Sequence, residues 1–197
     1  MSVPTRPVEI QPEPEPPTLV QPCTLVIFGG SGDLARRRLI PALYNLLLDG
    51  LLPANYAVIG LGRKSMTDEE FRDVVREGVK THSRQELIQE KWGEFERHLF
   101  YLPGDNDDPQ TYAALKARTE KIERTFQLPG NRIFYLSIPP SSFTPVCEGL
   151  AKAGLTSRPG PDVPYARIIV EKPVGRDLAS ARQINAGTGQ VFDESQI

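Results

Sequence analysis

The sequence contains few of the residues that build metal centres and disulfide frameworks. It has two cysteines and two histidines among 197 residues. Cys23 and Cys147 lie far apart, and neither belongs to a C-x-x-C pair or has a histidine close by. We therefore expect neither a disulfide framework nor a metal site. A reducing, cytoplasmic location fits this composition best.

The chain also lacks a marked excess of charge and any long apolar run. Its formal net charge of −2 gives no electrostatic reason to expect nucleic acid or an acidic membrane surface as a partner. No apolar stretch approaches the length that spans a bilayer, and no signal peptide is recognisable. With 39% hydrophobic and 24% charged residues, the sequence has the composition of one soluble globular domain.

The first 22 residues differ from the rest in composition. They contain seven prolines interspersed with Glu9, Glu13 and Glu15. Such a segment favours extended, solvated chain over helix, so we predict a disordered tail over residues 1–22 and a folded domain over residues 23–197. A proline-rich docking motif is the alternative interpretation of the tail.

From residue 23 onward, short apolar runs alternate with segments of helical period. The expected strands are 23–28, 56–61, 98–102, 132–138 and 166–171. Helices are expected to begin after residue 34 and near Thr67, Ser83, Asp108, Ser142 and Asp177, with possible capping boxes at Thr67-x-x-Glu70 and Ser83-x-x-Glu86. The segment 156–164 is predicted to be a loop. This rhythm predicts an α/β fold of the Rossmann type, a doubly wound, mostly parallel sheet with helices on both faces.

The first of these helices has a clear apolar stripe. The stripe consists of Leu39, Ile40, Leu43, Leu46 and Leu47. Asn45 falls outside this stripe, and Pro41 is expected to kink the helix.

A glycine-rich turn stands between the first strand and this helix. It reads Gly29-Gly30-Ser31-Gly32-Asp33-Leu34-Ala35. In this context a glycine turn lets backbone approach a pyrophosphate at the start of the helix. Two registers fit the dinucleotide pattern, one beginning at Gly29 and one at Gly30, and a turn without a ligand is the alternative. Three arginines, Arg36 to Arg38, begin the helix, where cations are unfavourable unless negative charge such as a phosphate is close.

The end of the second expected strand bears on the choice of cofactor. NAD-binding proteins usually place an acidic residue there, whereas this chain reads Gly62-Arg63-Lys64. A guanidinium can make charge-assisted bonds to a 2′-phosphate, so Arg63, supported by Lys64, favours NADP. An exposed arginine without a ligand is the alternative.

Two further motifs make the chain recognisable. Glu171-Lys172-Pro173-Val174-Gly175-Arg176-Asp177-Leu178 follows the last expected strand, and Phe134-Tyr135-Leu136-Ser137-Ile138-Pro139-Pro140 ends the one before it. Together with the glycine turn and Arg63, in this order, they resemble the N-terminal domain of glucose-6-phosphate dehydrogenases. The resemblance runs from Cys23 to Ile197.

The resemblance implies roles for individual residues. Gly29, Gly30, Ser31, Gly32, Asp33 and Leu34 would contact the pyrophosphate and ribose of NADP, and Arg63 its 2′-phosphate. Lys172 would contact both the cofactor and glucose 6-phosphate, and the peptide bond before Pro173 would be cis. Phe143 stands where some members have a tyrosine near the cofactor, so a phenolic hydrogen bond would be missing.

The resemblance also implies that this chain carries no catalytic base. The family's histidine-containing segment would begin just after Ile197, and the larger domain that forms the usual homo-oligomer interface would follow it. His82 and His98 lie outside the motif-bearing loops and are expected to be structural or solvated. We therefore expect an NADP-binding part of an enzyme that oxidises glucose 6-phosphate, inactive alone. A stand-alone, non-catalytic NADP-binding module is the alternative.

Overall fold

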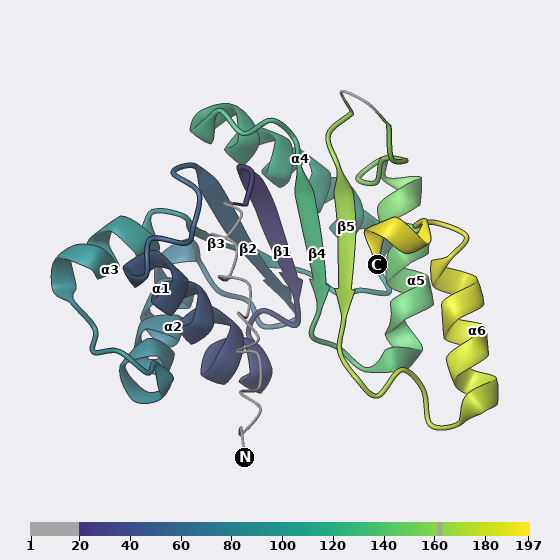
Figure 1. Cartoon of the computed structure of the whole chain (residues 1–197), viewed down its shortest axis with the longest axis horizontal. Helices are drawn as coiled ribbons and strands as arrows, with labels where there is room; N and C mark the ends of the chain where they lie inside the picture. The colour runs from purple at the N-terminus through teal and green to yellow at the C-terminus, as the bar shows by residue number, and fades with distance from the viewer. Residues whose placement is uncertain (1–19, 161–162) are drawn as a thin grey trace, which may run out of the picture.

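A computed structural model describes residues 20–160 and 163–197 and shows one parallel sheet covered by helices (Figure 1). The strands are β1 (Cys23–Phe28), β2 (Tyr56–Gly62), β3 (Leu99–Pro103), β4 (Arg132–Leu136) and β5 (Ala166–Val170). The main helices are α1 (Ile40–Leu48), α2 (Asp68–His82), α3 (Gln89–Glu96), α4 (Pro109–Phe126), α5 (Phe143–Lys152) and α6 (Leu178–Thr188). All five predicted strands are confirmed, with ends within two residues of those expected. Residues 1–19 of the predicted tail lie outside the described residues.

The strand order is β3-β2-β1-β4-β5, and every neighbouring pair is parallel. The chain moves from β1 outward to β3 and then returns to the other side of β1 to form β4 and β5. This reversal confirms the doubly wound α/β fold. In such sheets a crevice opens at the carboxyl ends of the strands where the order reverses, which here lies between β1 and β4.

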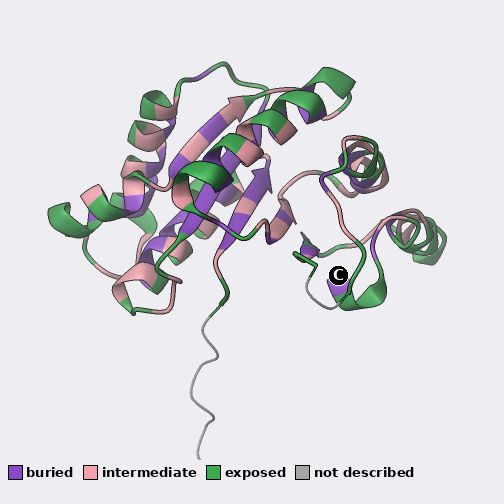
Figure 2. Cartoon of the chain, turned by 90° about the horizontal axis from the view of Figure 1, so that it is seen from above, coloured by how far each residue is buried: buried purple, intermediate pink, exposed green. Residues whose placement is uncertain are grey.

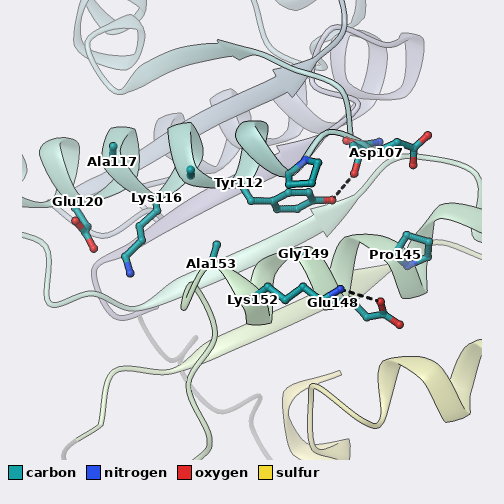
Figure 3. Close-up of a pocket in the computed structure, with 13 residues that line it drawn as sticks. Asp107, Tyr112, Lys116, Ala117, Glu120, Pro145, Glu148, Gly149, Lys152 and Ala153 are labelled. Carbon is teal, nitrogen blue, oxygen red and sulfur yellow. Dashed lines mark hydrogen bonds and ion pairs between the residues drawn. The ribbon is translucent and has the colours of Figure 1, made fainter.

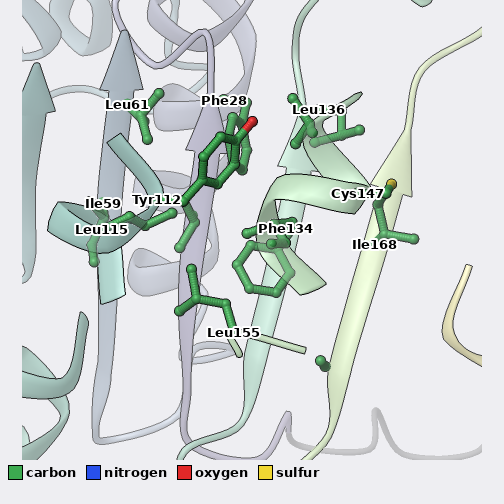
Figure 4. Close-up of a cluster of buried hydrophobic side chains, with 14 of the residues drawn as sticks. Phe28, Ile59, Leu61, Tyr112, Leu115, Phe134, Leu136, Cys147, Leu155 and Ile168 are labelled. Atoms are coloured by element: carbon green, nitrogen blue, oxygen red, sulfur yellow. The ribbon is translucent and has the colours of Figure 1, made fainter. Parts of the chain in front are cut away.

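Two apolar cores lie on opposite faces of the sheet. One core packs α4 and α5 against alternate residues of the strands, including Phe28, Phe134 and Ile168 (Figure 4). The other packs α1, α2 and α3 against the opposite face of β1, β2 and β3, around the fully buried Tyr44 and Trp92. Viewed from above, the buried positions concentrate on the sheet and on the inner sides of these helices (Figure 2). The alternation of apolar side chains between the two faces is what a parallel sheet buried on both sides requires.

The second face is covered only in part. Within the described part of the chain, none of the helices α1 to α6 lies in front of β4 and β5 in Figure 1, and Ile169 on β5 is 42% exposed. A groove of about 460 Å³ runs between these strands and α1, and its apolar lining includes Leu25, Leu43 and Ile133. The leucine stripe predicted for the first helix therefore faces this groove in part, and Leu46 is exposed.

The first helix differs from the prediction at its beginning. A π-helical turn at Ala35–Leu39 precedes α1, and the Ile40 N–H donates to the carbonyl of Ala35, five residues back. Pro41 has no N–H to donate, so it lies in the first turn of the regular helix rather than kinking its interior.

Two of the helix-start assignments have opposite outcomes. The capping box at Thr67 and Glu70 is confirmed at the start of α2. The one at Ser83 is wrong, because Ser83 ends α2 and the next helix begins at Gln89. The Ser83 hydroxyl donates instead to Asn45 Oδ1 at 2.8 Å, and Asn45, although it falls outside the apolar stripe, is buried.

The remaining assignments hold. Asp108 caps α4 with Pro109 in its first turn, and helices begin at Phe143 and Leu178 near the expected positions. The described residues of the 156–164 segment form neither helix nor strand. Across residues 20–160 and 163–197, every helix is too short or too polar to cross a bilayer.

A largely buried ion pair joins α4 to β4. Glu123 accepts two hydrogen bonds of 2.8 Å from Arg132, one from Nε and one from a terminal nitrogen. The two side chains are only 9% and 14% exposed. These two parallel bonds give the Glu123 carboxylate and the Arg132 guanidinium hydrogen-bond partners at the start of β4.

We predict that Glu123→Ala lowers the free energy of unfolding by about 3 kcal/mol, because the Arg132 guanidinium would keep a buried charge without its partner. The matched control is Glu77→Ala, which removes an exposed ion pair with Lys80 on α2 and should change stability by less than about 1 kcal/mol. Urea unfolding of both variants measures the difference. Equal decreases in the free energy of unfolding would show that the buried ion pair stabilises the fold no more than the exposed one.

Candidate cofactor site

The glycine loop, residues 29–34, lies on the carboxyl ends of the central strands. Gly30 N–H donates to the carbonyl of Leu61 at the end of β2, and Ser137 N–H after β4 donates to the carbonyl of Phe28. Gly32 N–H closes the turn onto the carbonyl of Gly29. These bonds tie the loop to both neighbours of β1.

The glycines have separate reasons to lack a side chain. Gly29 has a φ of +78°, in the left-handed region that favours glycine. A Cβ on Gly30 would lie 2.4 Å from the Cα of Gly60, so backbone packs directly on backbone there. A Cβ on Gly32 would lie 2.9 Å from the carbonyl oxygen of Gly29, at the exposed end of the loop. Gly32 is therefore the glycine with the most open surroundings.

One cavity of about 570 Å³ brings three of the predicted motifs together, namely the glycine turn, Arg63 and the 134–140 motif. It is lined by Gly29, Ser31, Gly32, Gly62, Arg63, Lys64, Gly104, Asp105, Asn106, Asp107, Ser137, Ile138, Pro139 and Ser142. These residues follow four different strands, and the cavity lies where the strand order reverses. Three residues of the loop do not line this cavity: Gly30, Asp33 and Leu34.

Arg63 enters the cavity from the turn that follows β2. Gly62 is buried, whereas Arg63 and Lys64 are exposed to solvent. The turn thus presents two cations beside the glycine loop. A bound phosphate could accept charge-assisted hydrogen bonds from this wall.

The cavity has a second, acidic wall that sequence reasoning missed. Asp105, Asn106 and Asp107 follow β3, the strand next to β2. Asp105 Oδ1 accepts the Asp107 N–H at 3.1 Å, so this carboxylate is engaged in shaping its own loop. The Gly104-Asp105 pair after an apolar strand was the available signal, because parallel strands end at the same edge.

The arginines at the helix start have a partner within the protein. Arg36 and Arg37 each lie 3.4 Å from a carboxylate oxygen of Asp33. The negative charge expected from a phosphate is thus supplied in part by Asp33. All three side chains are about half exposed or more, so these ion pairs contribute little to stability.

Lys172 lies apart from the glycine loop, at the carboxyl end of β5. It is exposed and lines neither the cofactor cavity nor the neighbouring cavity of about 900 Å³ between α5 and α6. Pro139 lines both cavities, and Pro173 lines the second. The Lys172–Pro173 peptide is cis, which confirms the expectation for this bond. Lys172 therefore stands near the second cavity, which adjoins the first.

The residue before Lys172 is held by a tyrosine. Tyr135 Oη donates a hydrogen bond to the Glu171 carboxylate across the ends of β4 and β5. Burial, with a further contribution from Glu171, raises the pKa of Tyr135 to about 12. Tyr135 therefore stays protonated and can act as the donor at neutral pH.

Phe143 and the two histidines lie outside the cavity. Phe143, the first residue of α5, is fully buried in the core and does not line the cavity. His98 stacks on Tyr56 with ring centroids 4.2 Å apart and pairs with the Tyr56 carbonyl, at the amino end of the sheet. Burial lowers the pKa of His98. His98 is therefore packed within the fold, whereas His82 is exposed at the end of α2.

A further groove between α4 and α5 adjoins the acidic wall of the cavity (Figure 3). Tyr112 donates a 2.7 Å hydrogen bond to the carbonyl of Asn106, and its ring lies against Gly149. Within the groove, Lys152 lies 3.6 Å from Glu148. The groove lies apart from the motifs singled out above, and the Tyr112 hydrogen bond holds the 105–107 loop on this side.

Comparisons with known proteins agree with this arrangement. A family model described as "Glucose-6-phosphate dehydrogenase, NAD binding domain" matches residues 26–197. The glucose-6-phosphate 1-dehydrogenase 2 of Mycobacterium tuberculosis is 40% identical over 92% of this chain, and the Bacillus subtilis enzyme is 34% identical over 88%. The chain spans 35% and 34% of their respective lengths.

Solved structures match as well. The glucose-6-phosphate 1-dehydrogenase of Mycobacterium avium superposes with a TM-score of 0.74 at 35% identity, over 89% of this chain and 35% of that one. A glucose-6-phosphate dehydrogenase in complex with its substrate gives a TM-score of 0.77 at 32% identity, over 90% of this chain and 36% of that one. The chain therefore belongs to the glucose-6-phosphate dehydrogenase family, within which it corresponds to the NAD-binding domain.

Proposed function

We propose that this chain binds NADP and forms the coenzyme-binding part of an enzyme that oxidises glucose 6-phosphate at C1 to the lactone. The observation that carries the proposal is the single cavity lined by the glycine loop and Arg63 at the point of strand reversal. Open α/β sheets bind nucleotides at this position. NADP is the cofactor because the residue after β2 is a guanidinium and not a carboxylate.

The residues present fit the cofactor's two anionic groups. Gly32 leaves room for backbone to approach a pyrophosphate, and the helix that follows directs its first N–H groups toward the loop. Arg63 and Lys64 line the same cavity beside the loop, where the 2′-phosphate would bind. The six loop residues Gly29, Gly30, Ser31, Gly32, Asp33 and Leu34 would hold the pyrophosphate and ribose, some of them by shaping the loop.

Lys172 would connect the cofactor to the sugar. It stands after β5 beside the cavity that adjoins the cofactor cavity, and its ammonium has three donors that can bond to a sugar hydroxyl. When bound, NADP would accept hydride from C1 of the sugar. The protein's part is to position both molecules and to supply positive charge.

We expect Arg63→Ala to weaken NADP binding far more than NAD binding. A hydrogen bond to a charged group contributes roughly 1.5–3 kcal/mol, so the preference for NADP should fall by about one to two orders of magnitude. Calorimetric titration of wild type and variant with each dinucleotide measures it. Arg38→Ala, an exposed arginine that does not line the cavity, is the matched control and should leave the preference unchanged. Equal losses for both dinucleotides would remove Arg63 from the 2′-phosphate site.

We expect Gly32→Val to abolish dinucleotide binding in a folded domain. Its Cβ would press on the carbonyl of Gly29, and its methyl groups would occupy space that the pyrophosphate needs. Far-UV circular dichroism checks the fold, and titration checks the affinity. Gly93→Val on α3, where a Cβ meets nothing within 4 Å, is the control that should bind normally. Retained affinity in Gly32→Val would refute the phosphate-loop assignment.

We expect the 197-residue chain to bind NADP without oxidising glucose 6-phosphate. Neither His82 nor His98 lies at the carboxyl edge, and a positioned general base contributes about 10²–10⁴-fold. NADPH absorbance would be followed with saturating NADP and sugar phosphate, using the full-length Mycobacterium tuberculosis relative as the positive control. Turnover by the chain alone would overturn the assignment of both histidines.

A further inference from the structure

Tyr101 on β3 places its hydroxyl beneath the turn that carries Arg63. The side chain is 3% exposed, and its ring packs against Phe71 with centroids 5.1 Å apart. Its hydroxyl lies 3.0 Å from the carbonyl oxygen of Gly62 and 2.8 Å from that of Lys64. These two residues flank Arg63 directly.

The hydroxyl has one proton to share between these acceptors. The Gly62 carbonyl already accepts a 2.9 Å bond from Gly104 N–H, and Lys64 O is the nearer acceptor. The Tyr101 hydroxyl therefore holds the turn at Lys64, after Arg63, while the Gly104 N–H holds it at Gly62, before Arg63. Burial raises the pKa of Tyr101, opposed by a smaller effect of the Ser31 hydroxyl, so the phenol remains a donor at neutral pH.

The same hydroxyl also adjoins the glycine loop. A Cβ on Gly62 would lie 2.7 Å from Ser31 Oγ and 3.0 Å from Tyr101 Oη. The space above Gly62 is thus filled by one side chain from the glycine loop and one from β3. The glycine loop and the turn that carries Arg63 therefore meet at Gly62.

The orientation of the Arg63 side chain depends on the conformation of its backbone. Among residues 20–160 and 163–197, no carboxylate forms an ion pair with the Arg63 guanidinium. A guanidinium makes two-bond contacts with a phosphate only in a narrow range of orientations. Fixing the peptide groups on either side of Arg63 reduces the conformational freedom that binding would otherwise remove.

We propose that Tyr101 is a positioning residue that sets the preference for NADP by holding the 62–64 turn, and through it Arg63, in the orientation that receives the 2′-phosphate. The inference rests on the function proposed above for Arg63. Tyr101 itself would touch neither the cofactor nor the sugar.

Tyr101→Phe tests the proposal, because it keeps the buried ring and removes only the hydroxyl. We expect NADP affinity to fall about three- to tenfold, the effect of one hydrogen bond, with NAD affinity nearly unchanged. Retained NAD binding reports that the variant is folded. The control is Tyr44→Phe, which removes a buried hydroxyl that accepts a 2.9 Å bond from Ile88 N–H, away from the cavity, and should leave the preference unchanged.

The variants are then combined with Arg63→Ala. If Tyr101 acts through Arg63, Tyr101→Phe should change the NADP-to-NAD affinity ratio in the wild-type background and leave it unchanged in Arg63→Ala. A ratio lowered by Arg63→Ala and unaffected by Tyr101→Phe would overturn the positioning role and leave the Arg63 assignment standing. Equal effects of Tyr101→Phe in both backgrounds would also overturn it. A ratio unaffected by Arg63→Ala would refute the proposed function, and the positioning role with it.

Discussion

Direct backbone packing between the glycine loop and its neighbouring strands is the constraint on which the candidate site depends. A Cβ on Gly29 would lie 2.2 Å from the carbonyl oxygen of Ser137, and one on Gly30 would lie 2.4 Å from the Cα of Gly60. The loop can therefore rest on β2 and β4 only without side chains at these positions. This contact sets how closely the loop approaches the carboxyl ends of β2 and β4. It thereby sets the width of the cavity that Arg63 lines.

Most of the fold could be predicted because local signals and the sheet agree. Strands such as β1 and β2 are apolar and bounded by turn residues, and the α/β alternation leaves few possible topologies. That topology also places Arg63 beside the glycine loop, since parallel strands end at one edge. The sequence pattern thus predicted that the glycine loop and Arg63 meet at this edge.

The errors arise where a side chain's partner lies elsewhere in the chain. Ser83 resembles a helix cap in sequence, yet its hydroxyl bonds to Asn45, 38 residues earlier. Asp105 and Asp107 carry no recognised motif, and only the pairing of β3 with β2 brings them to the cavity. Tertiary contacts of this kind cannot be read from local spacing.

The cavity is lined by loops from four strands, and this origin links ligand binding to folding as a whole. Each parallel pair joins segments separated by tens of residues, so the sheet forms through non-local contacts and the cavity exists only after they are made. A molecule that binds only the folded cavity stabilises the whole sheet from β1 through β4 by mass action. When its free concentration is a hundred times its dissociation constant, the free energy of unfolding rises by about 2.7 kcal/mol. The cellular level of the nucleotide would then act on this domain as a thermodynamic variable that sets the fraction of folded chains.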